Sequence, residues 1–203
     1  QKIEDTGLLT IKRMETVDDE TVAAAKKFIT EQVKADKPFF VWWNGTRMHF
    51  RTHVKDELLG ISGQDEYSDG MVEHDMHVGQ LLAKLDELGI ADDTIVVWAS
   101  DNGSGALKGE GIGAGGFWRG TFGGGWEGSY RTPAMIRWPG KIPAGVVTEE
   151  IVAALDWYPT LAALAGESDR VPTDRPFDGM DVSAFLQGQA DTSGRDNYLY
   201  IGV

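Results

Sequence analysis

The chain has 203 residues, 41% of them apolar, with no cysteine, and its 19 basic and 32 acidic side chains give a formal charge of −13. This length can bury a sizeable core, and the lack of cysteine excludes disulfides, zinc–thiolate sites and a cysteine nucleophile. The negative charge argues against nucleic acid and anionic membrane surfaces as partners, because both would be repelled. The closest approach to a basic cluster is Lys26, Lys27 and Lys34, which Glu31 and Asp36 dilute.

Apolar residues at helical spacing predict an amphipathic helix from Asp18 to Lys34, with acids in its first turn. A second helix is predicted from Ser68 to Leu88, with Ser68 as its candidate N-cap. Its buried side would carry Met71, Val72, Val78, Leu81, Leu82, Leu85 and Leu88. A third helix is predicted from Asp156 to Ala165, with Pro159 in its first turn and Gly166 after its end, and a short one near residues 182–186.

Continuous apolar runs predict strands at residues 38–43, 94–99 and 133–138, the first of them buried on both faces, and a further strand starts at 198–201. The longest runs fall short of the about 20 residues that span a bilayer. Helices and strands alternate, so the fold class is α/β with a mainly parallel sheet. We expect residues 1–166 to form part of one α/β domain and residues 167–203 to be a loop-rich C-terminal segment.

Two strand ends carry candidate functional residues, because ligands bind α/β sheets at the carboxyl ends of strands. After residues 95–99 the chain places Asp101 beside Asn102, and this pair of hard oxygen ligands suits Ca²⁺ or Mg²⁺. The alternative is an ordinary Asp-Asn-Gly turn. After residues 38–43, the loop 44–53 offers His49, His53 and two arginines to an oxyanion ester, although a loop histidine is more often a surface residue.

Three other features receive simpler interpretations. His74 and His77 lie one helical turn apart, and we interpret them as surface or helix-packing residues rather than a metal pair. Residues 103–128 hold many glycines but no Gly-Lys-Ser/Thr, so this stretch is a lid or an insertion rather than a phosphate loop. Tryptophans 42, 43, 118 and 126 could stack on a sugar or an aryl ring, or serve the core.

Several motifs, in order, resemble the central and C-terminal part of a sulfatase. They are residues 67–79 followed by 85–89, the Asp93–Gly103 segment with its Asp-Asn-Gly, Trp126–Pro133 leading into 136–142, Asp156–Leu161, and Asp178–Asp181. The resemblance implies the alkaline-phosphatase-like α/β/α sandwich, incomplete in this chain. It also implies hydrolysis of aryl or carbohydrate sulfate esters with one bound divalent cation, usually calcium. By motif position Asp101 and Asn102 would be metal ligands, and His49 would contact the sulfate and protonate the leaving oxygen.

The chain departs from the family pattern in two places. The family nucleophile is a formylglycine made in a Cys/Ser-x-Pro-x-Arg motif, and no residue here starts that pattern. We therefore expect formylglycine in an upstream segment and expect this chain alone to be inactive. Second, the position of a sulfate-binding lysine, five residues before Glu127, is occupied by Phe122. Arg119 or Lys108, from the same glycine-rich stretch, could supply the missing cation, and Phe122 could pack a lid.

The resemblance also implies partners and alternatives. The expected partners are a small-molecule or glycan sulfate ester and the missing N-terminal part of the same protein, with no nucleic acid and no membrane. The family favours a periplasmic or secreted location. Two other functions stay open: a phosphoesterase of the same superfamily, in which a threonine would replace the formylglycine precursor, and a non-catalytic scaffold or binding domain.

Overall fold

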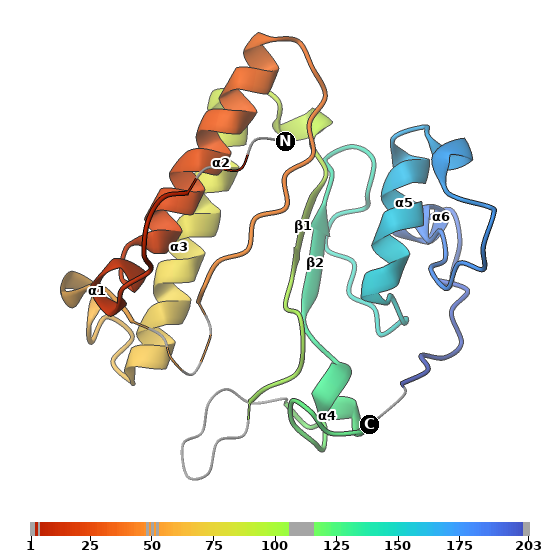
Figure 1. Cartoon of the computed structure of the whole chain (residues 1–203). Coiled ribbons are helices and arrows are strands. Elements are labelled where there is room, and N and C mark those ends of the chain that lie inside the picture. The colour runs from red at the N-terminus through yellow and green to blue at the C-terminus, as the bar shows by residue number, and fades with distance from the viewer. Residues whose placement is uncertain are drawn as a thin grey trace. The chain divides into compact units, whose positions relative to one another are not determined.

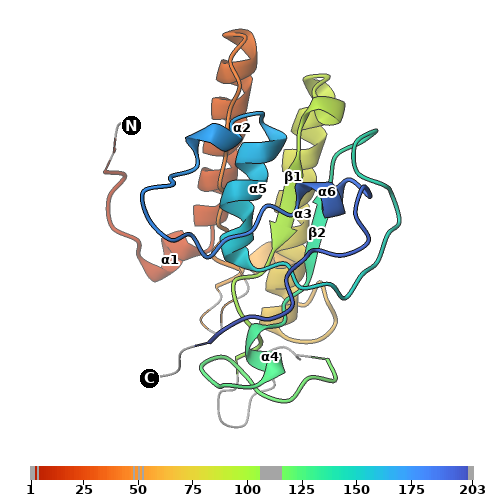
Figure 2. The same ribbon diagram turned by 90° about the vertical axis from the view of Figure 1, so that its right-hand side faces the viewer.

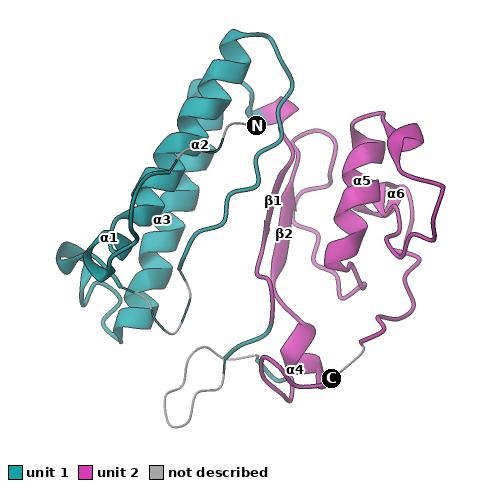
Figure 3. Ribbon diagram, viewed as in Figure 1, with its two compact units in different colours: residues 1–91, 103–117 teal, residues 92–102, 118–203 magenta. Residues whose placement is uncertain are grey.

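The computed structural model describes residues 3, 5–47, 49, 51, 53–105 and 116–200. The chain divides into two compact units, unit 1 with residues 1–91 and 103–117 and unit 2 with residues 92–102 and 118–203 (Figure 3). The short 3₁₀ helix η2 (Ala91–Asp93) lies at the junction of the two in the chain. None of the helices in the described ranges is both long and apolar enough to cross a bilayer.

Two long helices, α2 (Val17–Lys34) and α3 (Glu66–Glu87), pack side by side in unit 1 (Figure 1). Both begin at the same end of the unit, because the extended chain after α2 returns along the helix pair before α3 starts. The shorter helices α1 (Ile11–Met14) and η1 (Asp56–Leu58) complete the unit. The buried apolar side chains are those of Val22, Ala25, Ile29, Val54 and Leu85. The prediction of α2, including acids in its first turn, is confirmed.

Helix α3 begins earlier than predicted and buries different residues. Its N-cap is Asp65, whose carboxylate accepts a hydrogen bond of 2.8 Å from the Ser68 backbone amide, so Ser68 is not the cap. Met71, predicted to be buried, is 43% exposed, whereas Glu73 and His77 are buried. The reason is that loops from elsewhere in unit 1 bring cationic side chains onto this face of α3, and these loops could not be located from helical spacing.

The apolar run at residues 38–43 is extended, but it forms no ladder with any part of the chain that the structure describes. Its side chains alternate in exposure, since Phe40 is 70% and Trp42 79% exposed, whereas Phe39, Val41 and Trp43 are half-buried. Within unit 1 only one face of this run is covered, whereas the sequence predicted burial on both faces. The helix pair α2 and α3 accounts for the covered face, because Trp43 lies against α2 and α3 through Thr21 and His74.

Unit 2 contains a two-stranded sheet made of β1 (Val96–Ala99) and β2 (Ala134–Arg137). The strands are antiparallel, in a register that pairs Val96 with Arg137 and Ala99 with Ala134. The predicted strands at 94–99 and 133–138 are thus confirmed in position, but this pair is antiparallel rather than parallel. In its described residues, 100–105 and 116–133, the connection carries only the four-residue helix α4 (Glu127–Tyr130), and a parallel pair normally needs a longer crossover helix.

The C-terminal part of unit 2 is organised around α5 (Trp157–Leu164), which follows the 3₁₀ helix η3 (Ala154–Asp156). As predicted, this helix ends before Gly166, which has a φ of 75°, and a short helix α6 (Ser183–Leu186) follows η4 (Ser168–Arg170). Helices α5 and α6 are joined by the Thr160 hydroxyl, which accepts a hydrogen bond of 3.0 Å from the Val182 amide. Residues 198–200 form no strand, and residue 201 of the predicted strand lies outside the described residues.

Candidate functional site

Asp101 and Asn102 lie directly after β1, where the chain bends away from the sheet. The Ser100 amide still donates a hydrogen bond of 3.4 Å to the Pro133 carbonyl, so the sheet holds the chain up to the residue before Asp101. The Asp101 side chain is exposed and that of Asn102 is half-buried. The carboxylate and amide oxygens are hard donors on neighbouring residues, and this chemistry fits a calcium or magnesium ion.

Arg119 belongs to a tightly folded segment, residues 118–131, that wraps around α4. The Gly128 amide donates a hydrogen bond of 2.8 Å to the Arg119 carbonyl, and the Ser129 hydroxyl donates one of 2.6 Å to the Thr121 carbonyl. A Cβ atom on Gly128 would lie 2.6 to 2.9 Å from three carbonyl oxygens of residues 118–120. Only glycine therefore allows α4 to approach this backbone so closely.

The cationic and aromatic side chains of this segment are paired with one another. The Arg119 guanidinium lies 4.2 Å from the centroid of the Trp126 ring, and the Arg131 guanidinium lies 3.9 Å from that of Trp118. Arg131 also forms an ion pair with Glu127. Cation–π contact fixes the direction of a guanidinium while leaving its hydrogen-bond donors available to an anion. Trp118 and Trp126, two of the four tryptophans considered as stacking residues, thus stack on arginine here.

The segment with Arg119 and the Asp101–Asn102 pair lie at the same end of the sheet. Because Ala99 pairs with Ala134, the end of β1 adjoins the start of β2, and α4 ends just before β2 begins (Figures 1 and 2). Phe122, which replaces the expected lysine, is 66% exposed and does not fill the interior of the segment. Lys108, the other candidate cation, lies outside the described residues.

His49 belongs to unit 1, on the loop that follows the extended run 38–43. Its side chain is exposed, and its Nδ1 atom accepts a hydrogen bond of 3.4 Å from the Arg51 backbone amide. A neutral imidazole has one nitrogen of each kind, so an accepting Nδ1 places the proton on Nε2. In this tautomer the Nε2–H group can donate a hydrogen bond to an oxygen.

The loop before His49 is anchored by Arg47, which is buried rather than available to an anion. The Arg47 Nε atom donates a hydrogen bond of 2.8 Å to Glu73, and its Nη1 atom lies 3.7 Å from Asp18. The same guanidinium donates to the carbonyls of Met14 and Glu15 and to the Thr46 hydroxyl. The prediction that both arginines of this loop bind an oxyanion is therefore wrong for Arg47, whose donors are occupied within the protein.

His74 and His77 occupy two different environments on α3. His74 stacks on Trp43 with ring centroids 5.5 Å apart, and burial lowers the pKa of its imidazole. His77 is buried, and its Nε2 atom lies 2.8 Å from a carboxylate oxygen of Asp19. His74 is thus a packing residue, as predicted, whereas His77 forms part of a buried polar cluster that helical spacing alone did not indicate.

Within the described ranges, that cluster is the only place where three or more histidine or carboxylate side chains lie close enough to share a metal ion, and a lysine ammonium already lies beside it. Ligand atoms of Asp19, Glu73 and His77 lie within 4.8 Å of one another, and the Lys55 ammonium lies 2.9 Å from Asp19 and 3.5 Å from Glu73. Burial raises the pKa of the Asp19 carboxyl, but hydrogen bonds from His77 and Lys55 outweigh it and lower the pKa overall. Because the ammonium occupies the cation position, these residues form an ion-pair network.

A family model described as Sulfatase matches residues 2–167. The chain is 37% identical to rat (Rattus norvegicus) steryl-sulfatase over 166 residues, covering 78% of this chain and 28% of that protein. It is also 37% identical to dog (Canis lupus familiaris) N-acetylgalactosamine-6-sulfatase over 171 residues, covering 81% of this chain and 32% of that protein.

Among solved structures, the PsFucS1 sulfatase from Pseudoalteromonas sp. superposes with a TM-score of 0.85 at 30% sequence identity, covering 92% of this chain and 37% of that one. The described α/β structure is therefore part of the alkaline-phosphatase-like fold of these enzymes. The chain spans about a third of the length of the relatives it matches. The motifs, the fold and these matches together place the chain in the sulfatase family.

Proposed function

We propose that this chain is part of a sulfuric ester hydrolase that acts on aryl or carbohydrate sulfate esters with a bound divalent cation. The observation that carries the proposal is the Asp101–Asn102 pair at the end of β1, inside the region that matches the sulfatase model. The names of the relatives support both substrate classes, because the matches include two arylsulfatases and an N-acetylgalactosamine-6-sulfatase.

Each site residue has a distinct role in this proposal. Asp101 and Asn102 would hold Ca²⁺, or Mg²⁺ in its place, and the bound ion would supply positive charge next to the oxygens of the sulfate group. Arg119, held over Trp126, donates hydrogen bonds to the same group in place of the lysine that Phe122 replaces. These contacts bind and orient the ester at one end of the sheet.

His49 contacts the sulfate group and acts as the general acid. As the sulfur–oxygen bond of the ester breaks, the Nε2 proton passes to the departing alcohol oxygen, which leaves as an alcohol or a phenol. Overall, water and the sulfate ester give the alcohol and hydrogen sulfate. The tautomer with the proton on Nε2 is the one favoured by the Arg51 amide at Nδ1. Arg47, which anchors the preceding residues, is a positioning residue for this loop.

The proposal requires groups that the 203 residues do not contain. The chain has no cysteine and no serine in the Cys/Ser-x-Pro-x-Arg context, so it does not supply formylglycine. In the family pattern, two further acidic metal ligands lie upstream of that motif. We propose that an upstream segment of the same protein provides both. The chain by itself then lacks a nucleophile for the sulfur atom, and turnover needs the two parts together.

The test compares the isolated chain with the complete protein, in which the upstream segment is present. Release of inorganic sulfate from nitrophenyl sulfate and from sulfated sugars is measured with calcium and with a chelator. We expect metal-dependent turnover by the complete protein and none by the chain alone. Faster hydrolysis of the matching phosphate esters would favour a phosphoesterase, and no hydrolysis of either ester would favour a scaffold.

A further inference from the structure

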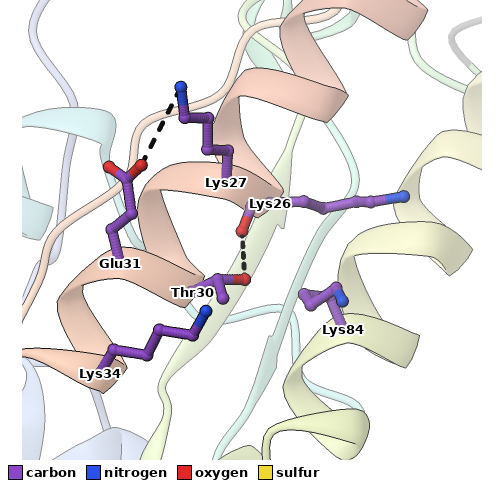
Figure 4. A pocket seen from close by; sticks show the side chains of 6 residues that line it. All are labelled: Lys26, Lys27, Thr30, Glu31, Lys34 and Lys84. Carbon is purple, nitrogen blue, oxygen red and sulfur yellow. Dashed lines mark hydrogen bonds and ion pairs between the residues drawn. The ribbon is translucent and has the colours of Figure 1, made fainter.

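A pocket of about 310 Å³ lies along the helices of unit 1, and none of its lining residues has a role assigned above. Five of its lining residues come from α2 and one from α3: Lys26, Lys27, Thr30, Glu31, Lys34 and Lys84. Figure 4 shows Lys26 extending from α2 in the direction of α3, with Lys84 on that neighbouring helix. The pocket thus collects four ammonium groups and one carboxylate in a chain whose formal charge is −13.

The sequence alone places three of these lysines close together but dilutes them with acids. The fold changes this balance, because Lys84 joins them from a position fifty residues or more along the chain. Internal partners use only part of the positive charge. Lys84 pairs with Glu87 at 2.5 Å, Lys27 lies 3.9 Å from Glu31, and the Lys26 ammonium donates to the neutral side chain of Gln80. Within the described ranges Lys34 has no ion pair.

Helix stability explains the presence of only some of these lysines. Lysines in the last turn of a helix complement the negative end of its dipole, and Lys34 and Lys84 are in that position. Lys26 and Lys27 lie about two turns before the end of α2, where the dipole effect has faded. Their contribution to the pocket therefore calls for a different reason.

We propose that this pocket is an accessory binding site for the anionic groups of a sulfated polysaccharide. The choice of ligand rests on the proposed function, in which carbohydrate sulfate esters are substrates. Residues 26–34 of α2 rise by about 12 Å along the helix axis, so its lysines can contact more than one anionic group of a single chain.

Binding to the pocket would hold a polymeric substrate on the enzyme while a different sugar unit occupies the catalytic site. Because the contacts are made by flexible, strongly hydrated ammonium groups, the site would recognise the density of sulfate groups rather than one sugar geometry. Its affinity would fall as salt rises, since a polyanion that meets several lysines releases its counterions.

The test is direct binding of a fluorescent dextran sulfate oligosaccharide to the 203-residue chain at low salt, followed by fluorescence polarisation. The variant Lys26→Gln/Lys34→Gln removes two charges from the pocket and keeps good helix formers. The matched control Lys12→Gln/Lys141→Gln removes the same charge from exposed sites outside it. Circular dichroism checks that both variants stay folded.

We expect the pocket variant to bind about tenfold more weakly and the control less than about twofold more weakly. The slope of log affinity against log salt should become shallower by about one to two in the pocket variant only. Equal losses in both variants, binding of unsulfated dextran, or tighter binding of single-stranded DNA of matched charge would each overturn the proposal. The assay needs no turnover, so a failure of the proposed hydrolase activity would leave its result unaffected.

Discussion

The Arg47 guanidinium and the Glu73 carboxylate form an ion pair of 2.8 Å between two side chains that are only 1% and 2% exposed. Asp18 and Lys55 extend this pair into a network that joins α2, α3 and the loop leading to His49. The network explains why polar residues occupy the inner face of α3. It also fixes the backbone just before the proposed general acid.

Replacement of Arg47 by methionine should destabilise the chain strongly. The change leaves Glu73 and Asp18 as buried carboxylates without their guanidinium, and breaking a buried pair from one side costs about 3–5 kcal/mol. Urea denaturation followed by circular dichroism measures the loss. As a control, Arg175→Met removes an exposed partner of Asp174 and should cost less than about 1 kcal/mol. Similar losses in the two variants would show that the network contributes little.

The Asp156–Arg195 pair should make stability depend on pH. Asp156 is fully buried, and burial raises the pKa of its carboxyl, but hydrogen bonds from Arg195 and from the amides of Ala153 and Met180 lower it overall. A carboxyl with a lowered pKa contributes stability above its unfolded pKa of about 4, and this contribution is lost as pH falls through the folded value.

Asp156→Asn should therefore lower the free energy of unfolding by about 3 kcal/mol at pH 7. It should also make the loss of stability between pH 4 and pH 2 smaller than in the unaltered protein. Denaturation at a series of pH values measures both effects. Asp174→Asn is the matched control, since Arg175 also lowers the pKa of the Asp174 carboxyl. The Asp174 side chain, unlike that of Asp156, is 67% exposed. An unchanged acid profile in the Asp156 variant would contradict the assignment.

Asp101→Ala should remove most of the bound calcium from the complete protein. An alanine supplies no oxygen ligand, and the remaining acidic ligands would repel one another without the ion. Metal content after gel filtration measures the effect. Asp93→Ala removes an exposed carboxylate from the other end of β1 and should leave the calcium content unchanged. Equal calcium in the Asp101 variant and the unaltered protein would exclude this residue as a ligand.

His49→Ala in the complete protein should affect different substrates unequally. A proton donor matters most for a sugar or alkyl sulfate, because that leaving oxygen is strongly basic, and least for a nitrophenyl sulfate. General acid catalysis contributes about 10² to 10⁴ in rate, so the loss of kcat should approach that range only for the sugar sulfate. His53→Ala tests the other histidine of the loop, and a loss confined to the sugar sulfate in that variant would assign the proton donor to His53 instead. Equal losses for both esters would assign His49 to binding the sulfate group alone.

Local sequence patterns determined the long helices, the positions of β1 and β2, and the small helix α6 of this chain. Helical spacing and end signals placed α2 and α5 almost to the residue, because these signals involve neighbours within one or two turns. The same is true of Asp101 and Asn102, whose position at the end of a strand follows from the apolar run before them.

Tertiary structure alone decided which charged side chains are buried and how the strands pair. Helical spacing on α3 favours Met71 as an inner residue, but Arg47 and Lys55 meet Glu73 on that face, so the carboxylate is buried and the methionine exposed. From the sequence alone, Arg47 would be taken for a surface cation, but in the fold Asp18 and Glu73 surround it. Lys84 likewise lies near the α2 lysines only because the two helices pack together. A buried charge depends on partners distant in sequence, and no local spacing encodes where those partners lie.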